Sequence, residues 1–139
     1  MKPFAHVTPD SLAAATAALQ LAGAAPVGGG SDLLGMIKDD LTAPDQLIRL
    51  TRLAGLGSIA PQPDGRIRVG GMITLSALSR HPMIRDRYAV LAQAAGSVGT
   101  PQIRNAGTLA GNLAQRPWCW YFRQGFPCYK HGGGRCFSR

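Results

Sequence analysis

The first third of the chain alternates between helical and strand-like hydrophobic spacing. Apolar runs at residues 24–27 and 46–50 predict strands, and residues 33–37 predict a helical turn between them. Ahead of them, the spacing predicts an amphipathic helix that Thr8 caps and Gly23 ends, with one face made of Leu12, Ala15, Ala18, Leu19 and Ala22. These elements predict a compact β-α-β-like unit at the N-terminus.

The middle of the chain follows a different pattern. Residues 58–60 and 66–69 flank a Pro63-Asp64-Gly65 turn, and this arrangement predicts a β-hairpin. Two helices are predicted next, at residues 74–79 and 88–98, and a His-Pro pair ends the first of them. The second helix leads into a glycine-rich stretch that we expect to be a loop.

Length and composition indicate one folded domain. The chain has 139 residues, of which 45% are hydrophobic and 16% charged, a balance that argues against disorder. No apolar run approaches the roughly 20 residues that span a bilayer, so we expect no membrane association. The first residues lack the apolar core of a signal peptide, which makes a cytoplasmic location the default expectation.

Positive charge is concentrated in the C-terminal third. The formal net charge is +8, from fifteen Lys and Arg against seven Asp, and no acidic residue follows Asp86. Such a region favours an anion, which can be a nucleic acid, a dinucleotide or a thiolate-bound iron–sulfur cluster. The basic residues are scattered singly, so we expect no nucleic-acid partner. A small basic nucleic-acid-binding protein with a metal-stabilised tail is the main alternative.

A glycine-rich loop follows the strand predicted at residues 24–27. Gly28, Gly29 and Gly30 leave backbone amides bare for an anionic ligand, and Ser31 adds a hydroxyl donor. The loop lacks the Lys-Ser/Thr ending of a Walker A loop and the spacing of the G-x-G-x-x-G fingerprint. Taken alone, three consecutive glycines are typical of a mobile turn, and Asp32 is typical of a helix N-cap.

A second loop, predicted at residues 99–112, is rich in small and amide-bearing residues. Gly107 and Gly111 open the main chain, while Thr108 and Asn112 can fix a ligand by side-chain hydrogen bonds. A plain connector between packed elements would not need this density of such residues. Two such loops can bind opposite ends of one cofactor, so we expect them to converge on a shared hollow.

The two loops resemble those of a known family, the FAD-binding subunits of the xanthine dehydrogenase family of molybdenum hydroxylases. The flavin domain of that family carries a Gly-Gly-Gly/Thr-Asp-Leu loop and an Arg-Asn-x-Gly-Thr-x-Gly-Gly-Asn loop. Residues 28–33 and 104–112 are similar to these motifs, with Ala110 in place of the first glycine of the pair. The resemblance covers nearly the whole chain. It implies an α+β, PCMH-type FAD-binding fold of the kind shared with vanillyl-alcohol oxidase, represented by its N-terminal subdomain and the start of the second.

The resemblance also implies which residues hold FAD. The first loop would bind the FAD pyrophosphate through main-chain amides, with contacts from Val27, Gly28, Gly29, Gly30, Ser31, Asp32 and Leu33. The second loop would lie along the flavin side and offer apolar surface near the ring system, with contacts from Ile103, Gly107, Thr108, Leu109, Gly111 and Asn112.

All cysteines lie in a tryptophan-rich tail: Cys119, Cys128 and Cys136. Their spacing disfavours a zinc knuckle, and their odd number without a signal peptide argues against a disulfide framework, although unligated thiols stay an alternative. The tail resembles the iron–sulfur insertion of bacterial aldehyde oxidoreductase flavin subunits, which implies that the three cysteines ligate a [4Fe-4S] cluster. Aromatic residues are interleaved with the cysteines and are expected to shield the cluster from water: Trp118, Trp120, Tyr121, Phe122 and Phe126. Because the fourth ligand is missing, we expect the chain to be a truncated N-terminal portion.

The resemblance implies three segments: an FAD-binding subdomain at 1–55, the start of a second at 56–115, and an incomplete iron–sulfur insertion at 116–139. The implied role is electron transfer through FAD to an acceptor, within a molybdenum-containing xanthine or aldehyde oxidoreductase. No residue of this chain is expected to be catalytic. The implied partners are a molybdopterin-binding large subunit and a [2Fe-2S] small subunit in a hetero-oligomer. A periplasmic location by co-export with a partner and a non-functional remnant are the remaining alternatives.

Overall fold

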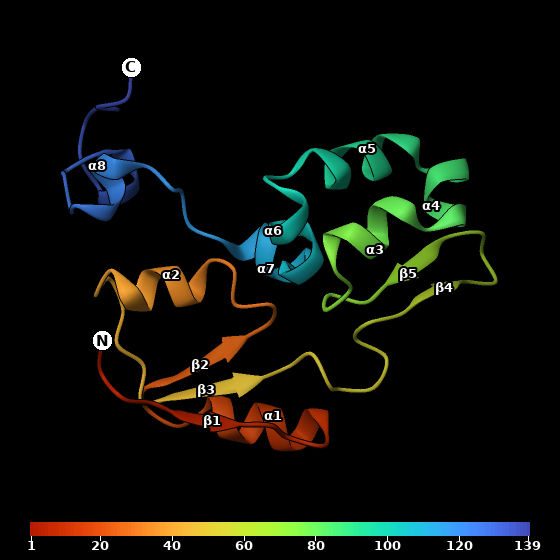
Figure 1. Cartoon of the computed structure of the whole chain (residues 1–139), viewed down its shortest axis with the longest axis horizontal. Coiled ribbons are helices and arrows are strands. Elements are labelled where there is room, and N and C mark those ends of the chain that lie inside the picture. Colours follow the sequence, from red (N-terminus) through yellow and green to blue (C-terminus); the bar gives the residue numbers. More distant parts are fainter.

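The computed structural model describes residues 1–139, and its first unit is a three-stranded parallel sheet. The strands are β1 (Ala5–Val7), β2 (Ala24–Val27) and β3 (Gln46–Arg49), in the order β1-β3-β2 (Figure 1). β2 and β3 confirm the two predicted strands. β1 was not predicted, because it is only three residues long and two of them are exposed, so the strand has almost no hydrophobic pattern.

Helices cover both faces of this sheet. Leu47 and Ile48 are adjacent residues of β3, so their side chains point to opposite faces, and both are fully buried. Ile48 packs with Ala15 of α1 (Leu12–Leu19), whereas Leu47 packs with Ile37 of α2 (Leu33–Lys38). Figure 1 shows α1 below the sheet and α2 above it. The sheet is therefore the centre of a small α/β/α sandwich.

The predicted N-cap of the first helix is wrong. Thr8 lies just after β1, and the helix begins only after Ser11, whose hydroxyl oxygen accepts a hydrogen bond from the Ala14 amide at 3.2 Å. A capping oxygen must lie two or three residues before the amide that it binds, and Thr8 is too far from the first helical turn.

The second unit begins with the predicted hairpin. Strands β4 (Ile59–Pro61) and β5 (Ile67–Val69) pair antiparallel, and the hairpin packs on three helices: α3 (Leu75–Arg80), α4 (Pro82–Arg87) and α5 (Ala89–Ser97). Their shared core consists of Ile73, Leu75, Leu78, Ile84 and Ala95. The helix α4 was not predicted. The sequence marks Pro82 as an interruption, but proline also suits the first position of a new helix.

The stretch predicted as a second loop is instead a pair of short helices. α6 (Pro101–Ala106) and α7 (Leu109–Ala114) are joined by Gly107 and Thr108. Thr100 caps α6 by accepting from the Ile103 amide at 3.3 Å, and Thr108 caps α7 by accepting from the Gly111 amide at 3.2 Å. Two threonine caps therefore start helices here in spite of the glycines, and only the junction at residues 107–108 remains a turn.

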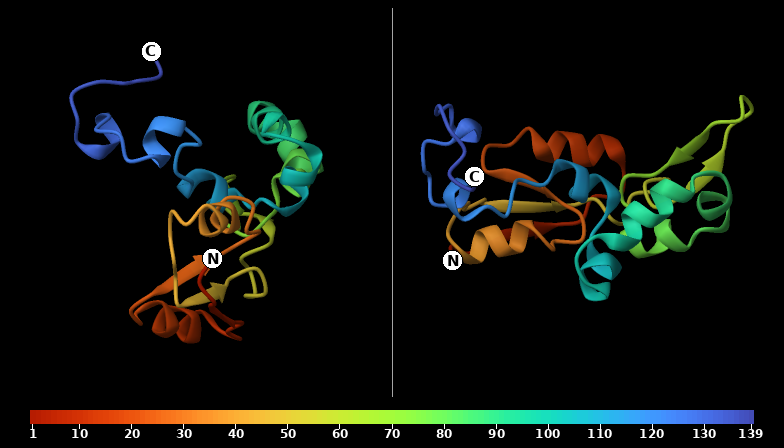
Figure 2. Two further views of the ribbon diagram at one scale, coloured as in Figure 1. Left: turned by 60° about the vertical axis from the view of Figure 1, so that its left-hand side comes forward. Right: turned by 90° about the horizontal axis from the view of Figure 1, so that it is seen from above.

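The chain ends in a tail with little regular structure. It contains one helical turn, α8 (Trp120–Arg123), and a 3₁₀ turn, η1 (Tyr129–His131). The tail leaves α7 and folds back beside α2, where the Trp118 ring lies over Gly35 (Figure 2). None of the helices in the structure has both the length and the apolar character that crossing a membrane requires.

Candidate functional site

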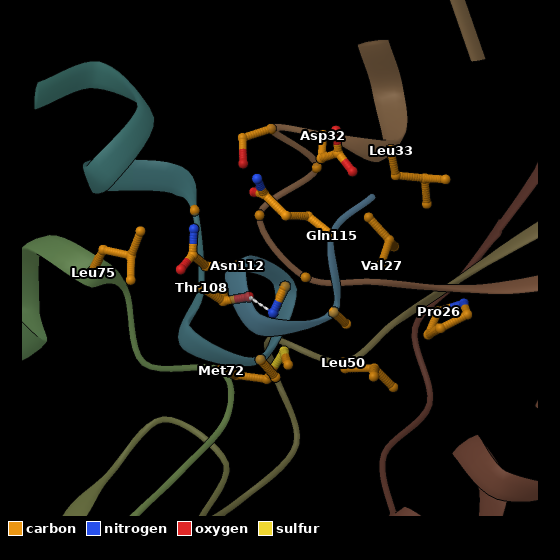
Figure 3. A pocket seen from close by; sticks show the side chains of 18 of the residues that line it. Pro26, Val27, Asp32, Leu33, Leu50, Met72, Leu75, Thr108, Asn112 and Gln115 are labelled. Atoms are coloured by element: carbon orange, nitrogen blue, oxygen red, sulfur yellow. Dashed lines mark hydrogen bonds between the residues drawn. The ribbon is translucent and has the colours of Figure 1, made fainter. Parts of the chain in front are cut away.

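A pocket of about 390 Å³ lies where the first unit meets α6 and α7. Its walls come from the end of β2, the glycine loop that follows, the segment before α3, and α7 with the residues after it (Figure 3). Its lining residues are Ala25, Pro26, Val27, Gly28, Gly29, Gly30, Ser31, Asp32, Leu33, Met36, Leu50, Met72, Leu75, Val98, Ile103, Gly107, Thr108, Ala110, Gly111, Asn112, Ala114, Gln115 and Arg116. The two predicted loop regions thus share one hollow.

The first loop presents a run of unused backbone donors. The amides of residues 28–32 donate no hydrogen bond to any acceptor within the chain. Gly30 adopts the left-handed conformation, with φ of +74°, which turns the main chain between β2 and α2. Successive amides in such a turn form a concave nest that binds anions. Bare amides beside an open pocket fit a ligand that carries phosphate oxygens.

Positions 28 and 29 require glycine for a second reason: they pack tightly against the α6–α7 region. A side chain on Gly29 would collide with the carbonyl oxygen of Ala106, and a Cβ on Gly28 would lie 2.7 Å from the hydroxyl oxygen of Thr108. The first loop therefore packs directly against the junction of α6 and α7, and this packing closes one side of the pocket.

The junction itself is fixed to the second unit by backbone hydrogen bonds. The Leu75 amide donates to the Gly107 carbonyl at 2.9 Å, and the Leu109 and Ala110 amides donate to the carbonyls of Ile73 and Gly71 at 2.9 and 2.8 Å. Most amides of this region therefore have partners inside the protein, unlike those of the first loop. The polar groups that the α6–α7 region offers to a ligand are therefore side chains. Asn112 and the buried Thr108 are two that line the pocket (Figure 3).

Of the residues implied to contact FAD, all but Leu109 line this pocket. Leu109 packs against the core of the second unit instead, because its position in α7 turns it away from the hollow. The site also includes residues that the sequence reasoning missed, among them Met72, Gln115 and Arg116. Ala110 has no positive φ, so the extra methyl group is compatible with its helical backbone.

The three cysteines line a second hollow of about 360 Å³ in the tail. Cys128 is buried, whereas Cys119 and Cys136 are half-buried. The Sγ of Cys119 lies 3.3 Å from the hydroxyl of Ser138, and this hydrogen bond lowers the pKa of the Cys119 thiol. No three Cys, His, Asp or Glu side chains converge closely enough to hold one metal ion. The thiols thus share a cavity without forming a mononuclear site.

The aromatic side chains shield this hollow only in part. Tyr121, Phe126 and Phe137 pack together with ring centroids 5.3 to 5.6 Å apart. The expectation that the tryptophans shield the hollow is wrong. Trp118 and Trp120 are 59% and 68% exposed, and neither lines the hollow. Their aromatic character suggested burial, but the small tail has too little mass to enclose every large ring.

An ion pair joins the tail to the first loop. Arg123 of α8 donates to the carboxylate of Asp32 at 3.0 Å, across 91 residues of sequence. Asp32 occupies the N-cap position of α2, as the sequence indicated, but its side chain caps no amide and binds Arg123 instead. The sequence holds no local signal for a contact at such separation.

The sequence of the chain matches a known protein family and several of its members. The family described as the FAD binding domain in molybdopterin dehydrogenase matches residues 2–117. The aldehyde oxidoreductase FAD-binding subunit PaoB of Escherichia coli (strain K12) is 36% identical over 132 residues, which cover 94% of this chain and 41% of that subunit. An alignment of that length includes Cys119 and Cys128.

Two further relatives match a shorter part of the chain. The nicotinate dehydrogenase FAD-subunit of Eubacterium barkeri is 36% identical and covers 82% of this chain and 39% of its own length. The carbon monoxide dehydrogenase structure from Hydrogenophaga pseudoflava superposes with a TM-score of 0.78 at 32% identity, over 82% of this chain and 40% of that one. The chain therefore spans about two fifths of the length of these relatives.

Proposed function

Because the chain belongs to the family of FAD-binding domains of molybdopterin dehydrogenases, we propose that it binds FAD as all or part of the electron-transfer subunit of a molybdenum-containing xanthine or aldehyde oxidoreductase. Its α+β fold is that of the FAD-binding subunits, as the resemblance implied. When bound, FAD supplies the redox step: it accepts electrons from iron–sulfur centres and passes them to an acceptor.

The run of free amides at residues 28–32 is the observation that carries this proposal. A diphosphate is an anion that needs several hydrogen-bond donors, and N–H groups that bind a charged oxygen form stronger hydrogen bonds than neutral pairs do. The nest opens into a pocket whose other wall holds apolar side chains such as Met72 and Ile103. That combination fits a ligand with a charged middle and flat, largely apolar ends.

We assign the roles of individual residues accordingly. The amides of residues 28–32 hold the pyrophosphate, with Val27 and Leu33 packed behind them. On the opposite wall, Gly107 and Gly111 have no side chain and so leave room for the dinucleotide. Thr108 and Asn112 orient it by hydrogen bonds. Ile103 contributes apolar surface, and Leu109 supports the wall from the core side. These residues bind and orient, and none of them moves a proton.

We further propose that Cys119, Cys128 and Cys136 ligate an iron–sulfur cluster of the [4Fe-4S] type. The support is that all three thiols line one hollow although they cannot share a single ion. In a multi-iron cluster each thiolate binds a different iron atom, so the ligands lie further apart than around one zinc ion. In this proposal the chain provides three thiolate ligands, and a group other than its cysteines takes the fourth position.

We propose that the assembly has a molybdopterin-binding large subunit and a [2Fe-2S] small subunit as partners. Names of relatives such as the carbon monoxide dehydrogenase medium chain fit a flavin subunit within a larger enzyme. Within the chain, we propose residues 1–55 and 56–115 as two FAD-binding segments and residues 116–139 as the iron–sulfur segment.

Equilibrium ultrafiltration with FAD, followed by a visible spectrum after reconstitution with iron, sulfide and dithiothreitol, whose thiolate can occupy the fourth ligand position, tests both parts. We expect retained flavin bands and, in addition, a broad thiolate-to-iron shoulder. Cys128→Ser should remove the shoulder and keep the flavin, which separates the two assignments. A chain that retains no flavin at any FAD concentration contradicts the FAD proposal, and a spectrum without the shoulder contradicts the cluster proposal.

A further inference from the structure

We propose that Arg123 is a positioning residue of the flavin site, because it neutralises Asp32 inside the anion-binding loop and so couples FAD affinity to docking of the cysteine tail. This inference rests on the proposed FAD function. It concerns a contact between two segments that lie 91 residues apart, the glycine loop and the tail.

The guanidinium of Arg123 is held in place from several sides. Its Nη2 lies 3.0 Å from the Oδ1 of Asp32, and the two side chains are only 10% and 20% exposed. The guanidinium carbon lies 3.7 Å from the ring centroid of Trp118, and the Nε donates to the carbonyl of Pro117 at 3.3 Å. A planar, stacked guanidinium of this kind loses little freedom when it forms a hydrogen bond.

Asp32 needs such a partner because of where it lies. It lines the pocket and its amide is one of the five free donors, so its carboxylate stands beside the place proposed for the pyrophosphate. Two anions at close range repel each other, more strongly where protein excludes water. No lysine or arginine occurs between residues 3 and 37. Arg49 of β3 pairs with Val27 next to the loop, but its Nε donates to the Thr51 hydroxyl at 2.8 Å and no ion pair joins it to Asp32. Arg116 lines the pocket, but no ion pair joins it to Asp32.

The docked tail is therefore the source of the compensating charge. Trp118 packs over Gly35 of α2, where a side chain on Gly35 would lie 3.2 Å from the indole ring. This contact brings the segment from Pro117 to Arg123 against the N-terminal end of α2. The Nη1 of Arg123 is buried with no hydrogen-bond acceptor, and Asp39 lies 4.0 Å away. A buried donor without a partner is costly, so the side chain is not optimised for stability alone.

A charge-compensating role and a purely structural role predict different behaviour in paired variants. If Arg123 only anchors the tail, removing its charge is harmful whatever residue stands at position 32. If Arg123 compensates the Asp32 carboxylate, the defect of Arg123→Met disappears once the carboxylate is also removed. Asp32→Asn keeps the size of the side chain and removes its charge, so it provides this rescue test.

The experiment is an FAD titration of the full chain, followed by flavin fluorescence at low and at physiological salt. We expect Arg123→Met to weaken FAD binding by about tenfold at low salt, and by less at physiological salt because the repulsion is screened. Asp32→Asn should bind at least as tightly as the wild type. The Asp32→Asn/Arg123→Met double variant should return to within about threefold of the wild type.

Two further variants serve as controls. Arg135 also stacks on an aromatic ring of the tail, at 4.2 Å from the Phe137 centroid, but no ion pair or side-chain hydrogen bond joins it to the first loop. Arg135→Met should therefore leave FAD affinity unchanged. Arg123→Lys keeps the charge and should bind more tightly than Arg123→Met. If circular dichroism shows that Arg123→Met does not fold, Arg123→Gln, which also removes the charge, replaces it in the comparison.

The outcomes separate this inference from the function on which it rests. A wild-type chain that takes up no FAD overturns the proposed function and the inference with it. A wild-type chain that binds FAD while Arg123→Met binds equally well overturns the inference alone. Failure of Asp32→Asn to rescue Arg123→Met also overturns it, because the role of Arg123 is then structural.

Discussion

Gly29 and the carbonyl oxygen of Ala106 pack so closely that no side chain fits between them. These two residues belong to the two regions that form the pocket proposed for FAD, and their contact determines how far apart the walls stand. The distance between the loops is therefore set by the absence of one Cβ atom.

Gly29→Ala should separate the two walls. The added methyl group meets backbone rather than a flexible side chain, so we expect a loss of stability of about 2 kcal/mol or more, together with loss of FAD binding. Urea unfolding and FAD titration measure both effects. Gly57→Ala is the matched control, because a Cβ there meets open space, and it should change stability by less than about 0.5 kcal/mol. Equal behaviour of the two variants would contradict the packing argument.

Thr108→Ala should destabilise the junction between α6 and α7. The Thr108 hydroxyl oxygen accepts from the Gly111 amide at 3.2 Å and caps α7, and the side chain is buried. Loss of a cap costs about 1 kcal/mol in free energy of unfolding. Thr108→Ser keeps the hydroxyl and should retain most of that free energy, as measured by urea unfolding. A serine variant as unstable as the alanine variant would show that the methyl group, and not the cap, is what matters.

Cys119 should be the most readily alkylated thiol in protein purified without iron. The hydrogen bond to Ser138 lowers the pKa of Cys119 from the ordinary value of 9.0, so the thiolate forms at a lower pH. The rate of iodoacetamide labelling, followed by mass spectrometry across pH, should rise with an apparent pKa below 9.0. Ser138→Ala should move this profile to higher pH. An unchanged profile in that variant would rule out the hydrogen bond as the cause.

Asp64 should make the β4–β5 hairpin sensitive to acid. Hydrogen bonds from the side chain and the amide of Arg66 lower the pKa of Asp64 in the folded chain. A lowered folded-state pKa means that this stabilisation is present above the unfolded value of about 3.9 and is lost as pH falls through the folded value. Asp64→Asn should lower Tm at pH 7 and make no difference near pH 2. A Tm difference that persists at pH 2 would point to another cause.

The sequence was sufficient wherever structure depends on neighbouring residues. The hairpin around Pro63-Asp64-Gly65 and the cap at Thr74 are local features, and the structure has both, with Thr74 accepting from the Ala77 amide at 3.1 Å. The motifs at residues 28–33 and 104–112 together indicated the family that the comparisons identify.

The sequence was insufficient where structure depends on distant residues. The strand β1 exists only because β3 pairs with it, and the Arg123–Asp32 ion pair depends on how the tail folds back over α2. In the second region, glycines suggested a loop, although threonine caps at positions 100 and 108 start two helices. The threonine caps favour helices in this region and the glycines favour a loop. Backbone hydrogen bonds to residues 71–75 hold the region in its helical form.

We propose that the bare amides of residues 28–32 bind the diphosphate of FAD. Amide chemical shifts from ¹⁵N-labelled protein, recorded while FAD is added, report on these groups one by one. We predict that the resonances of Gly28, Gly29 and Gly30 move by the largest amounts, while that of Gly57, far from the pocket, stays in place. If FAD binds and these three glycine resonances do not move, the diphosphate lies elsewhere and the account of the site is wrong.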